Sequence, residues 1–187
     1  MPAGAAGARN AQRRAKERAA KAEKEKVSAT FKHYDKNGNG EISREELSQM
    51  LTELGNGTKP TENELTFIMK TSDTKPPEGK LGEEEFVSAI SGWQCYQREF
   101  ADPKSYGAML FKQHDTDGSG KLNKEQLGNY LNDLAPATDE DVDWVMSQAD
   151  VLKDGEVSKI ELNMALGLWY QKKAEKAPEK SSVCALL

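Results

Sequence analysis

The chain has few cysteines for disulfides and lacks the long apolar runs that span membranes. Of its 187 residues only two, Cys95 and Cys184, are cysteine. No apolar run approaches the roughly 20 residues that a membrane-spanning helix needs, and mean hydropathy is −0.79. The charged N-terminus is followed by no apolar core, so we expect no secretory signal. Two cysteines give no disulfide framework, and we therefore expect a reducing, intracellular location.

Residues for catalysis are equally scarce. The two histidines, His33 and His114, have no evident cysteine or serine partner. The sequence also contains no glycine-rich phosphate loop and no zinc pattern. We expect both histidines to lie at helix ends and the protein to be no enzyme.

The net charge of −5 hides an uneven distribution. Residues 1–26 carry eight Lys or Arg and three Glu, and residues 171–187 carry four Lys and two Glu. The body, residues 27–170, carries 14 basic and 26 acidic residues. An acidic body favours cation binding, and basic ends favour anionic partners. No aromatic residue interleaves the N-terminal basic residues and the body would repel phosphate, so we expect no nucleic-acid binding.

One pattern recurs four times in the body. A glycine is followed two residues later by an aliphatic residue, and five residues after that by another apolar residue. The glycines are Gly40, Gly79, Gly120 and Gly155, the aliphatic residues Ile42, Leu81, Leu122 and Val157, and the later apolar residues Leu47, Phe86, Leu127 and Leu162.

Apolar residues at helical spacing flank each of these glycines, which predicts four helix–loop–helix units. Capping pairs, Thr61 with Glu64 and Thr138 with Asp141, open the second and fourth units. We expect an all-α fold of two lobes. The expected parts are a basic helical or disordered arm over 1–26, lobes over 27–92 and 106–170, a linker over 93–105 that packs partly on a lobe, and a basic tail over 171–187.

The first loop, residues 35–46, has the composition of a Ca²⁺ site. Ca²⁺ is a hard cation that takes about seven oxygen ligands, which a twelve-residue loop supplies from positions 1, 3, 5, 7, 9 and 12. Gly40 stands at position 6, where the backbone needs a positive φ. Those six ligand positions hold Asp35, Asn37, Asn39, the Glu41 carbonyl, Ser43 and bidentate Glu46. Ile42 points inward and can pair with its equivalent in the neighbouring loop.

With every slot of this loop filled, residues 27–170 resemble the calmodulin-like EF-hand superfamily. The resemblance implies helix–loop–helix units paired two per lobe, and a role as Ca²⁺ sensor or buffer. The other three loops depart from the pattern, so each is considered separately.

The second loop, taken as residues 74–85, does not look competent. This alignment places Thr74, Pro76 and Glu78 at positions 1, 3 and 5, and proline offers no side-chain oxygen. The acid at Asp73 suggests a loop that is one residue too long. We expect it to pair with the first loop rather than to bind a metal.

The third loop, residues 115–126, is complete in its first half and altered at its end. Its ligand positions hold Asp115, Asp117, Ser119, the Lys121 carbonyl, Asn123 and Gln126. Gln126 offers one neutral oxygen where two charged ones are expected. We predict a weaker Ca²⁺ site, or one shifted towards six-coordinate Mg²⁺.

The fourth loop, residues 150–161, keeps its last acid and loses its position-3 ligand. Its candidate ligands are Asp150, Asp154, Glu156 and Glu161, and Leu152 stands at position 3. The sequence leaves metal binding here undecided.

The two ends suggest contact with a membrane surface. Cys184-Ala185-Leu186-Leu187 resembles a prenylation box, in which terminal leucine typically directs geranylgeranyl transfer to the cysteine. Nearby lysines at 172, 173, 176 and 180 would supply the second, electrostatic signal that one lipid chain needs. Residues 5–26 are read either as an electrostatic arm for an anionic partner or as a solvated helix.

The sequence therefore predicts a monomeric, membrane-tethered Ca²⁺ sensor. Ca²⁺ in the first loop would open an apolar groove for a partner helix. We expect residues such as Phe31, Met50, Met69 and Phe86 to line this groove. Two alternatives remain open, namely a structural scaffold with degenerate loops and a simple Ca²⁺ buffer.

Overall fold

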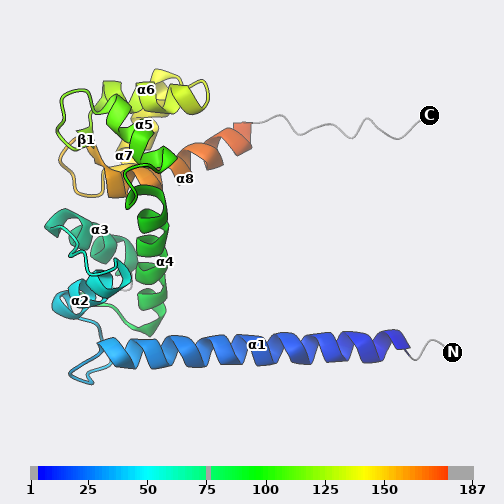
Figure 1. Cartoon of the computed structure of the whole chain (residues 1–187). Coiled ribbons are helices and arrows are strands. Elements are labelled where there is room, and N and C mark those ends of the chain that lie inside the picture. The colour runs from blue at the N-terminus through cyan, green and yellow to red at the C-terminus, as the bar shows by residue number, and fades with distance from the viewer. Residues whose placement is uncertain (1–3, 75–76, 177–187) are drawn as a thin grey trace, which may run out of the picture. The chain divides into compact units, whose positions relative to one another are not determined.

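The fold is almost entirely helical. The computed structural model of the protein describes residues 4–74 and 77–176, shown in colour in Figure 1. Its elements in chain order are α1 (Gly4–Tyr34), α2 (Arg44–Leu54), α3 (Glu62–Ser72), α4 (Glu83–Phe100), α5 (Tyr106–His114), β1 (Lys121–Leu122), α6 (Lys124–Leu134), α7 (Asp139–Ala149), β2 (Val157–Ser158) and α8 (Lys159–Lys176). Within the described range, a loop joins each successive pair of helices as the repeat predicts, and the all-α fold class is confirmed.

The chain divides into two compact units. The first comprises Met1–Thr61 and Ile68–Ser91, and the second Glu62–Phe67 and Gly92–Leu187. The boundary therefore passes through α3 and α4 rather than through a separate connection. The linker predicted over 93–105 is helix as far as Phe100, because Trp93, Tyr96 and Phe100 follow one another at helical spacing and are buried in the second unit.

The core of the first unit joins the helices on either side of the first two loops. Phe31 and Phe86 meet edge to face, with their ring centroids 5.3 Å apart. Ile42 and Leu81, both fully buried, form an antiparallel bridge between the two loops. The predicted pairing of Ile42 with its equivalent is thus confirmed.

The second unit repeats this arrangement with a two-stranded sheet. β1 and β2 are antiparallel, with Leu122 opposite Val157 and Lys121 opposite Ser158. Leu122 and Val157 are fully buried, and Phe111, Tyr130 and Trp169 of the same unit are at most 1% exposed. The aliphatic residues of the sequence repeat therefore hold the two loops of each unit together.

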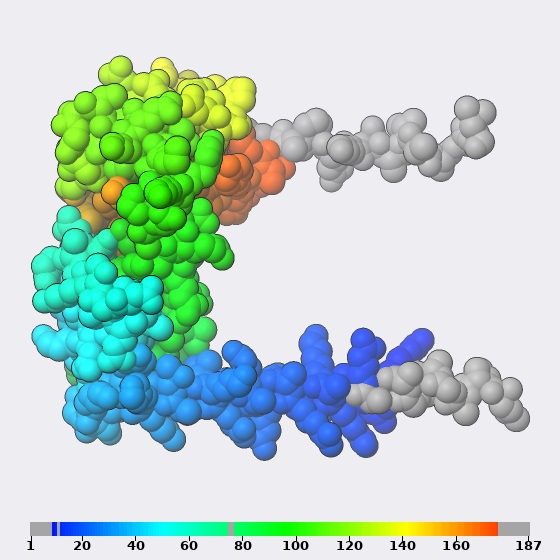
Figure 2. Space-filling model, in the orientation of Figure 1, coloured from blue at the N-terminus to red at the C-terminus, as the bar shows by residue number. Residues whose placement is uncertain are grey.

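The basic arm is continuous with the helix that enters the first loop. α1 runs without a break from Gly4 to Tyr34, and side chains 12–26 are exposed (Figure 2, blue). Alanine, lysine, arginine and glutamate are strong helix formers, which explains a helix with so little burial. No helix in the described part of the chain is long and apolar enough to span a membrane.

Candidate metal centre

The first loop is folded around its own side-chain oxygens. The carboxylate of Asp35 accepts hydrogen bonds from the Asn39 and Gly40 amides, at 3.1 and 2.9 Å. The side-chain oxygens of Asn37 and Asn39 accept from the amides two residues later, each at 2.9 Å. Gly40 has φ +82°, a conformation that any other L-residue adopts only with strain. Backbone donors therefore hold the oxygens of positions 1, 3 and 5 within one turn of chain.

Glu46 closes the loop from the start of α2. Ser43 and Glu46 form a capping box, in which the Ser43 amide and hydroxyl each donate to Glu46 Oε2 at 2.9 Å. The Lys36 amide donates to Oε1, also at 2.9 Å. Burial of the carboxyl group would raise its pKa, but these donors outweigh burial and the pKa of Glu46 is lowered. Glu46 is therefore a fixed, ionised carboxylate at neutral pH.

This donor set suits a hard divalent cation. All six predicted positions in residues 35–46 carry oxygen, and Glu46 supplies the two oxygens of a bidentate ligand. The side chain of Glu41 pairs with Lys80 at 2.7 Å. That ion pair leaves the site intact, because position 7 contributes its main-chain carbonyl.

The second loop begins one residue earlier than expected. Asp73, rather than Thr74, takes the first position, because its Oδ2 accepts from the amides of Glu78 and Gly79 as Asp35 does in the first loop. The Thr74 amide donates to Glu85 Oε1 at 2.8 Å. The loop therefore runs over 73–85, with one extra residue between its first acid and its glycine. Pro76 lies outside the described residues.

In the third loop, Gln126 turns a donor towards the loop. Its Oε1 accepts from the Asn123 amide at 2.9 Å, as the capping box requires. Its Nε2 consequently faces the loop and donates to Thr116 Oγ1 at 3.1 Å. In the first loop the corresponding atom is Oε1 of Glu46, an acceptor. A metal ion would meet the Gln126 N–H unless the amide rotated and broke the cap.

The first half of the third loop keeps the expected geometry. Asp115 Oδ2 accepts from the Gly120 amide at 3.0 Å, and Asp117 Oδ1 accepts from the Ser119 amide at 3.1 Å. The pKa of Asp117 is lowered mainly by the hydrogen bond from the Ser119 amide and further by the hydrogen bond from the Ser119 hydroxyl. Four of the predicted ligands thus lie in one turn of the loop, and Gln126 closes the loop from α6. These four are Asp115, Asp117, Ser119 and the Lys121 carbonyl.

The fourth loop holds its first and last acids with the same hydrogen bonds as the first loop. Glu161 is fully buried, and its two oxygens accept from the Leu152 amide at 2.9 Å and from the Ser158 amide and hydroxyl at 3.0 and 2.7 Å. Asp150 accepts from the amides of Asp154 and Gly155. Within the part of the chain that the structure describes, no three Asp, Glu, His or Cys side chains converge as a metal cluster. This holds for Asp150, Asp154 and Glu161 of the fourth loop and equally for Asp35, Glu41 and Glu46 of the first.

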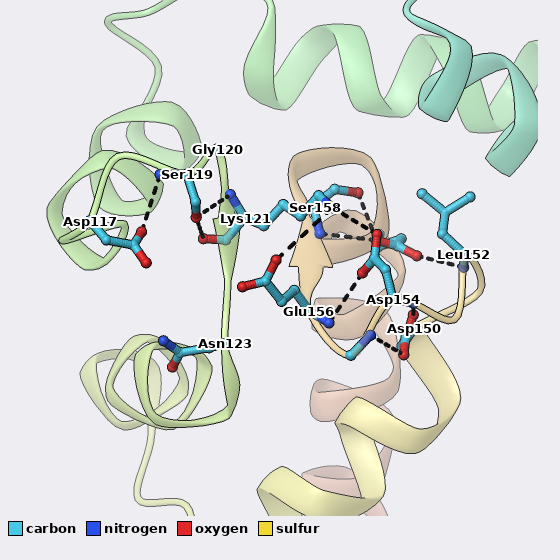
Figure 3. A network of polar contacts seen from close by, with 12 residues as sticks. Asp117, Ser119, Gly120, Lys121, Asn123, Asp150, Leu152, Asp154, Glu156 and Ser158 are labelled. Carbon is cyan, nitrogen blue, oxygen red and sulfur yellow. Dashed lines mark hydrogen bonds and ion pairs between the residues drawn. The ribbon is translucent and has the colours of Figure 1, made fainter.

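A lysine from the third loop reaches the acids of the fourth. Lys121 Nζ lies 2.8 Å from Asp154 Oδ2 and 4.0 Å from Glu156 Oε2 (Figure 3). The other Asp154 oxygen accepts from the Glu156 amide at 3.2 Å. The hydrogen bond to Asp154 raises the pKa of Lys121 above its ordinary value. Asp154, a predicted ligand, therefore already faces a cation through its side chain, and so does Glu156, whose expected ligand atom is its main-chain carbonyl.

Comparison with known proteins finds EF-hand domains over three of the four loops. An EF-hand domain pair matches residues 24–91, and an EF-hand domain matches residues 108–135. A calmodulin-like protein of Oryza sativa subsp. japonica is 30% identical over 128 residues, which cover 68% of this chain and 73% of that protein. The chain belongs to the calmodulin-like EF-hand superfamily.

Other relatives agree with this placement. A 16 kDa calcium-binding protein of Schistosoma mansoni is 30% identical to this EF-hand protein over 137 residues, which cover 72% of this chain and 89% of the relative. A solved redox protein from Chlamydomonas reinhardtii covers 90% of this chain and 57% of its own, with a TM-score of 0.45 and 24% identity. That likeness is too low to support an argument. As a calmodulin-like protein, the chain binds Ca²⁺.

Sequence reasoning missed one cluster of the EF-hand protein. Asp141, with 2% of its side chain exposed, lies 3.1 Å from Lys172 Nζ and 3.5 Å from Lys173 Nζ. Both lysines also stack on tryptophans, with Nζ 4.5 Å from the Trp144 centroid and 4.1 Å from the Trp169 centroid. Two lysines predicted for the membrane surface are thus bonded within the second unit. Cys184 and the rest of the terminal box lie outside the described residues.

Proposed function

We propose that the loop of residues 35–46 is the principal Ca²⁺ site of this EF-hand protein. The observation that supports it is the oxygen set described above, with Glu46 ionised and held on both oxygens. The expected ligands are the six predicted ones, from Asp35 to Glu46. Ca²⁺ would bind the remaining lone pairs of these oxygens without any new charged residue having to approach.

Calorimetric titration with Ca²⁺ and with Mg²⁺ tests this site. Glu46→Gln removes one charged oxygen of the bidentate ligand, and we expect at least a ten-fold loss of Ca²⁺ affinity, about 1.4 kcal/mol or more. Glu45→Gln is the matched control, because Glu45 is exposed and in the same helical turn. Equal Ca²⁺ affinities of Glu46→Gln and Glu45→Gln would show that the first loop is not the principal site.

For the remaining loops we propose a graded loss of metal binding. The third loop takes Ca²⁺ weakly or prefers Mg²⁺, since Gln126 presents a donor to its centre. The fourth counts as a degenerate EF-hand with Leu152 at position 3. The second, with its extra residue, serves to pair with the first. Amide NMR resonances of Gly40, Gly79, Gly120 and Gly155, one glycine in each loop, would report the four sites separately.

The leading role that we propose is a Ca²⁺ sensor that binds a partner protein and has no catalytic function. Phe31, Met50, Met69 and Phe86 are all buried in the first unit, so the predicted groove is closed here. Ca²⁺ entering between α1 and α2 would change the angle of these helices and expose that core to an apolar helix of the partner. The second unit already exposes Tyr106, Met109 and Tyr170.

Exposure of apolar surface decides between the sensor and its alternatives. Binding of a fluorescent apolar dye should rise when Ca²⁺ is added, and should not rise in Glu46→Gln. A scaffold gives no rise, and this alternative is favoured by the three imperfect loops, namely the second, the third and the fourth. A buffer binds Ca²⁺ with the same heat but leaves dye binding unchanged.

We further propose that a lipid on Cys184 tethers a monomeric, cytoplasmic protein to a membrane. The terminal box supports it. Because Lys172 and Lys173 are bonded to Asp141, the electrostatic part of the tether falls to Lys176, Lys180 and the exposed basic side chains of α1. Mass spectrometry of protein from its own cell would detect the lipid. Cys184→Ser should abolish flotation with anionic vesicles, and persistent flotation would argue for α1 as the anchor.

A further inference from the structure

The position of Lys121 is set by the sheet of the second unit. In a strand, successive side chains point to opposite faces. Leu122 is fully buried, so its neighbour Lys121 points away from the core. Lys121 lies opposite Ser158 in the register, which is two residues after Glu156 and four after Asp154. Its ammonium therefore reaches across the strand pair rather than out to solvent.

The atoms that it reaches belong to the fourth loop's ligand positions. Figure 3 shows the Lys121 side chain between the third and fourth loops, directed at Asp154 and Glu156. Lys121 and Asp154 keep 26% and 31% of their side chains exposed, so the pair is shielded in part from water. With the Glu156 amide on Oδ1 and the lysine on Oδ2, both Asp154 oxygens are engaged.

The first unit contains an equivalent lysine with a different partner atom. Lys80 precedes Leu81 as Lys121 precedes Leu122, and it also crosses to the neighbouring loop. Its partner is the Glu41 side chain, at position 7, where an EF-hand uses the carbonyl. Lys80 thus pairs with a side chain that is not expected to bind the metal, whereas Lys121 pairs with a ligand carboxylate at position 5.

We infer that the Lys121 ammonium is a built-in cation of the fourth loop, which competes with a divalent ion for Asp154 and keeps the second unit's paired loops folded without metal. The loop has lost one ligand at Leu152 and carries four acids at 150, 154, 156 and 161. An internal charge on these acids lowers their mutual repulsion, and it must leave Asp154 before Ca²⁺ can use that oxygen. This inference concerns the fourth loop and does not depend on the first loop being the principal site.

The test is the Ca²⁺ titration of the Gly155 amide resonance in Lys121→Met, with the full chain. Methionine keeps an unbranched apolar side chain and removes the charge. We expect the apparent Ca²⁺ affinity at Gly155 to rise about two- to five-fold, because an ion pair of this exposure contributes at most about 1 kcal/mol. Lys80→Met is the matched control, and its Gly155 titration should equal that of the unaltered protein.

Two further readouts distinguish a competing cation from an ordinary surface ion pair. In chelator, Lys121→Met should lower the thermal midpoint of the second unit more than Lys80→Met lowers that of the first. Lys121→Arg keeps the charge, so its Gly155 affinity should stay low, and this variant serves also if Lys121→Met does not fold in chelator. An unchanged Gly155 affinity in Lys121→Met, or a raised one in Lys121→Arg, overturns the inference. The Gly40 titration, read from the same spectra, tests the principal site independently.

Discussion

The ion cluster around Asp141 provides the sharpest test of how the second unit is held together. Asp141 lies in the first turn of α7, and Lys172 and Lys173 lie near the end of α8. Asp141 has 2% of its side chain exposed, against 18% for Lys172 and 29% for Lys173. Asp141→Asn keeps the size of the side chain and one oxygen to cap α7, and it replaces the negative charge by a neutral amide.

The expected cost follows from these exposures. Removing one partner of a fully buried ion pair typically costs 3–5 kcal/mol, and a fully exposed pair contributes about 0–1 kcal/mol. The lysines here are partly exposed and can turn towards water, so we expect a loss of about 2 kcal/mol. For a chain of this size that corresponds to a fall in Tm of roughly 4–8 °C.

Chemical denaturation in chelator, followed by tryptophan fluorescence, measures this loss. Trp93, Trp144 and Trp169, the three tryptophans of the chain, all belong to the second unit. Asp139→Asn is the matched control, because Asp139 is exposed in the same first turn of α7. Lys172→Met should lose less in the Asp141→Asn background than alone. If Asp141→Asn unfolds like Asp139→Asn, the cluster does not hold α8 to α7.

Three other outcomes are expected. Gln126→Glu replaces an N–H that faces the third loop by an oxygen, so the Ca²⁺ affinity read from its glycine amide should rise at least ten-fold; an unchanged affinity would refute the donor geometry. Leu122→Ala should lower the free energy of unfolding by about 2–5 kcal/mol, because it leaves a cavity between the paired loops; calorimetry would measure it, and a loss under 1 kcal/mol would contradict the packing. Burial raises the pKa of Tyr130 to about 12. Since the unfolded chain loses that proton near pH 10 and the native state does not, the contribution of Tyr130 to stability should be constant below about pH 10 and fall between pH 10 and 12 by about 1.4 kcal/mol per pH unit; Tyr130→Phe should unfold with a shallower slope in that range, and an equal slope would refute the shift.

The repeat was the informative part of the sequence for the fold. Glycine and aliphatic residues at fixed spacing determine where a loop turns and which residue bridges to the next loop, and both are local properties. The bridge between Ile42 and Leu81 and the helix ends at His33 and His114 therefore follow from the pattern. The pattern did not define the linker over 93–105. The apolar spacing from Trp93 to Phe100 continues the helix before it, and spacing alone does not show where a unit ends.

The ion pairs could not be read from the sequence, because they join residues far apart in the chain. Lys121 and Asp154 are separated by 33 residues, and Lys173 and Asp141 by 32. Each charge alone is consistent with a solvated surface, and only the packing of the second unit brings the partners together. The start of the second loop was predicted to within one residue. Asp73 stands beside the predicted first position, and the structure selects it through its bonds to Glu78 and Gly79.

Because α1 is an unbroken helix that leads into the first loop, a change of angle at the loop is amplified at the far end of the helix. From Arg9 to Tyr34 the helix rises about 38 Å at 1.5 Å per residue. A tilt of ten degrees at Tyr34 would therefore sweep the far end through roughly 6.5 Å. A small rearrangement around a bound ion would thereby become a large movement of a positively charged helix.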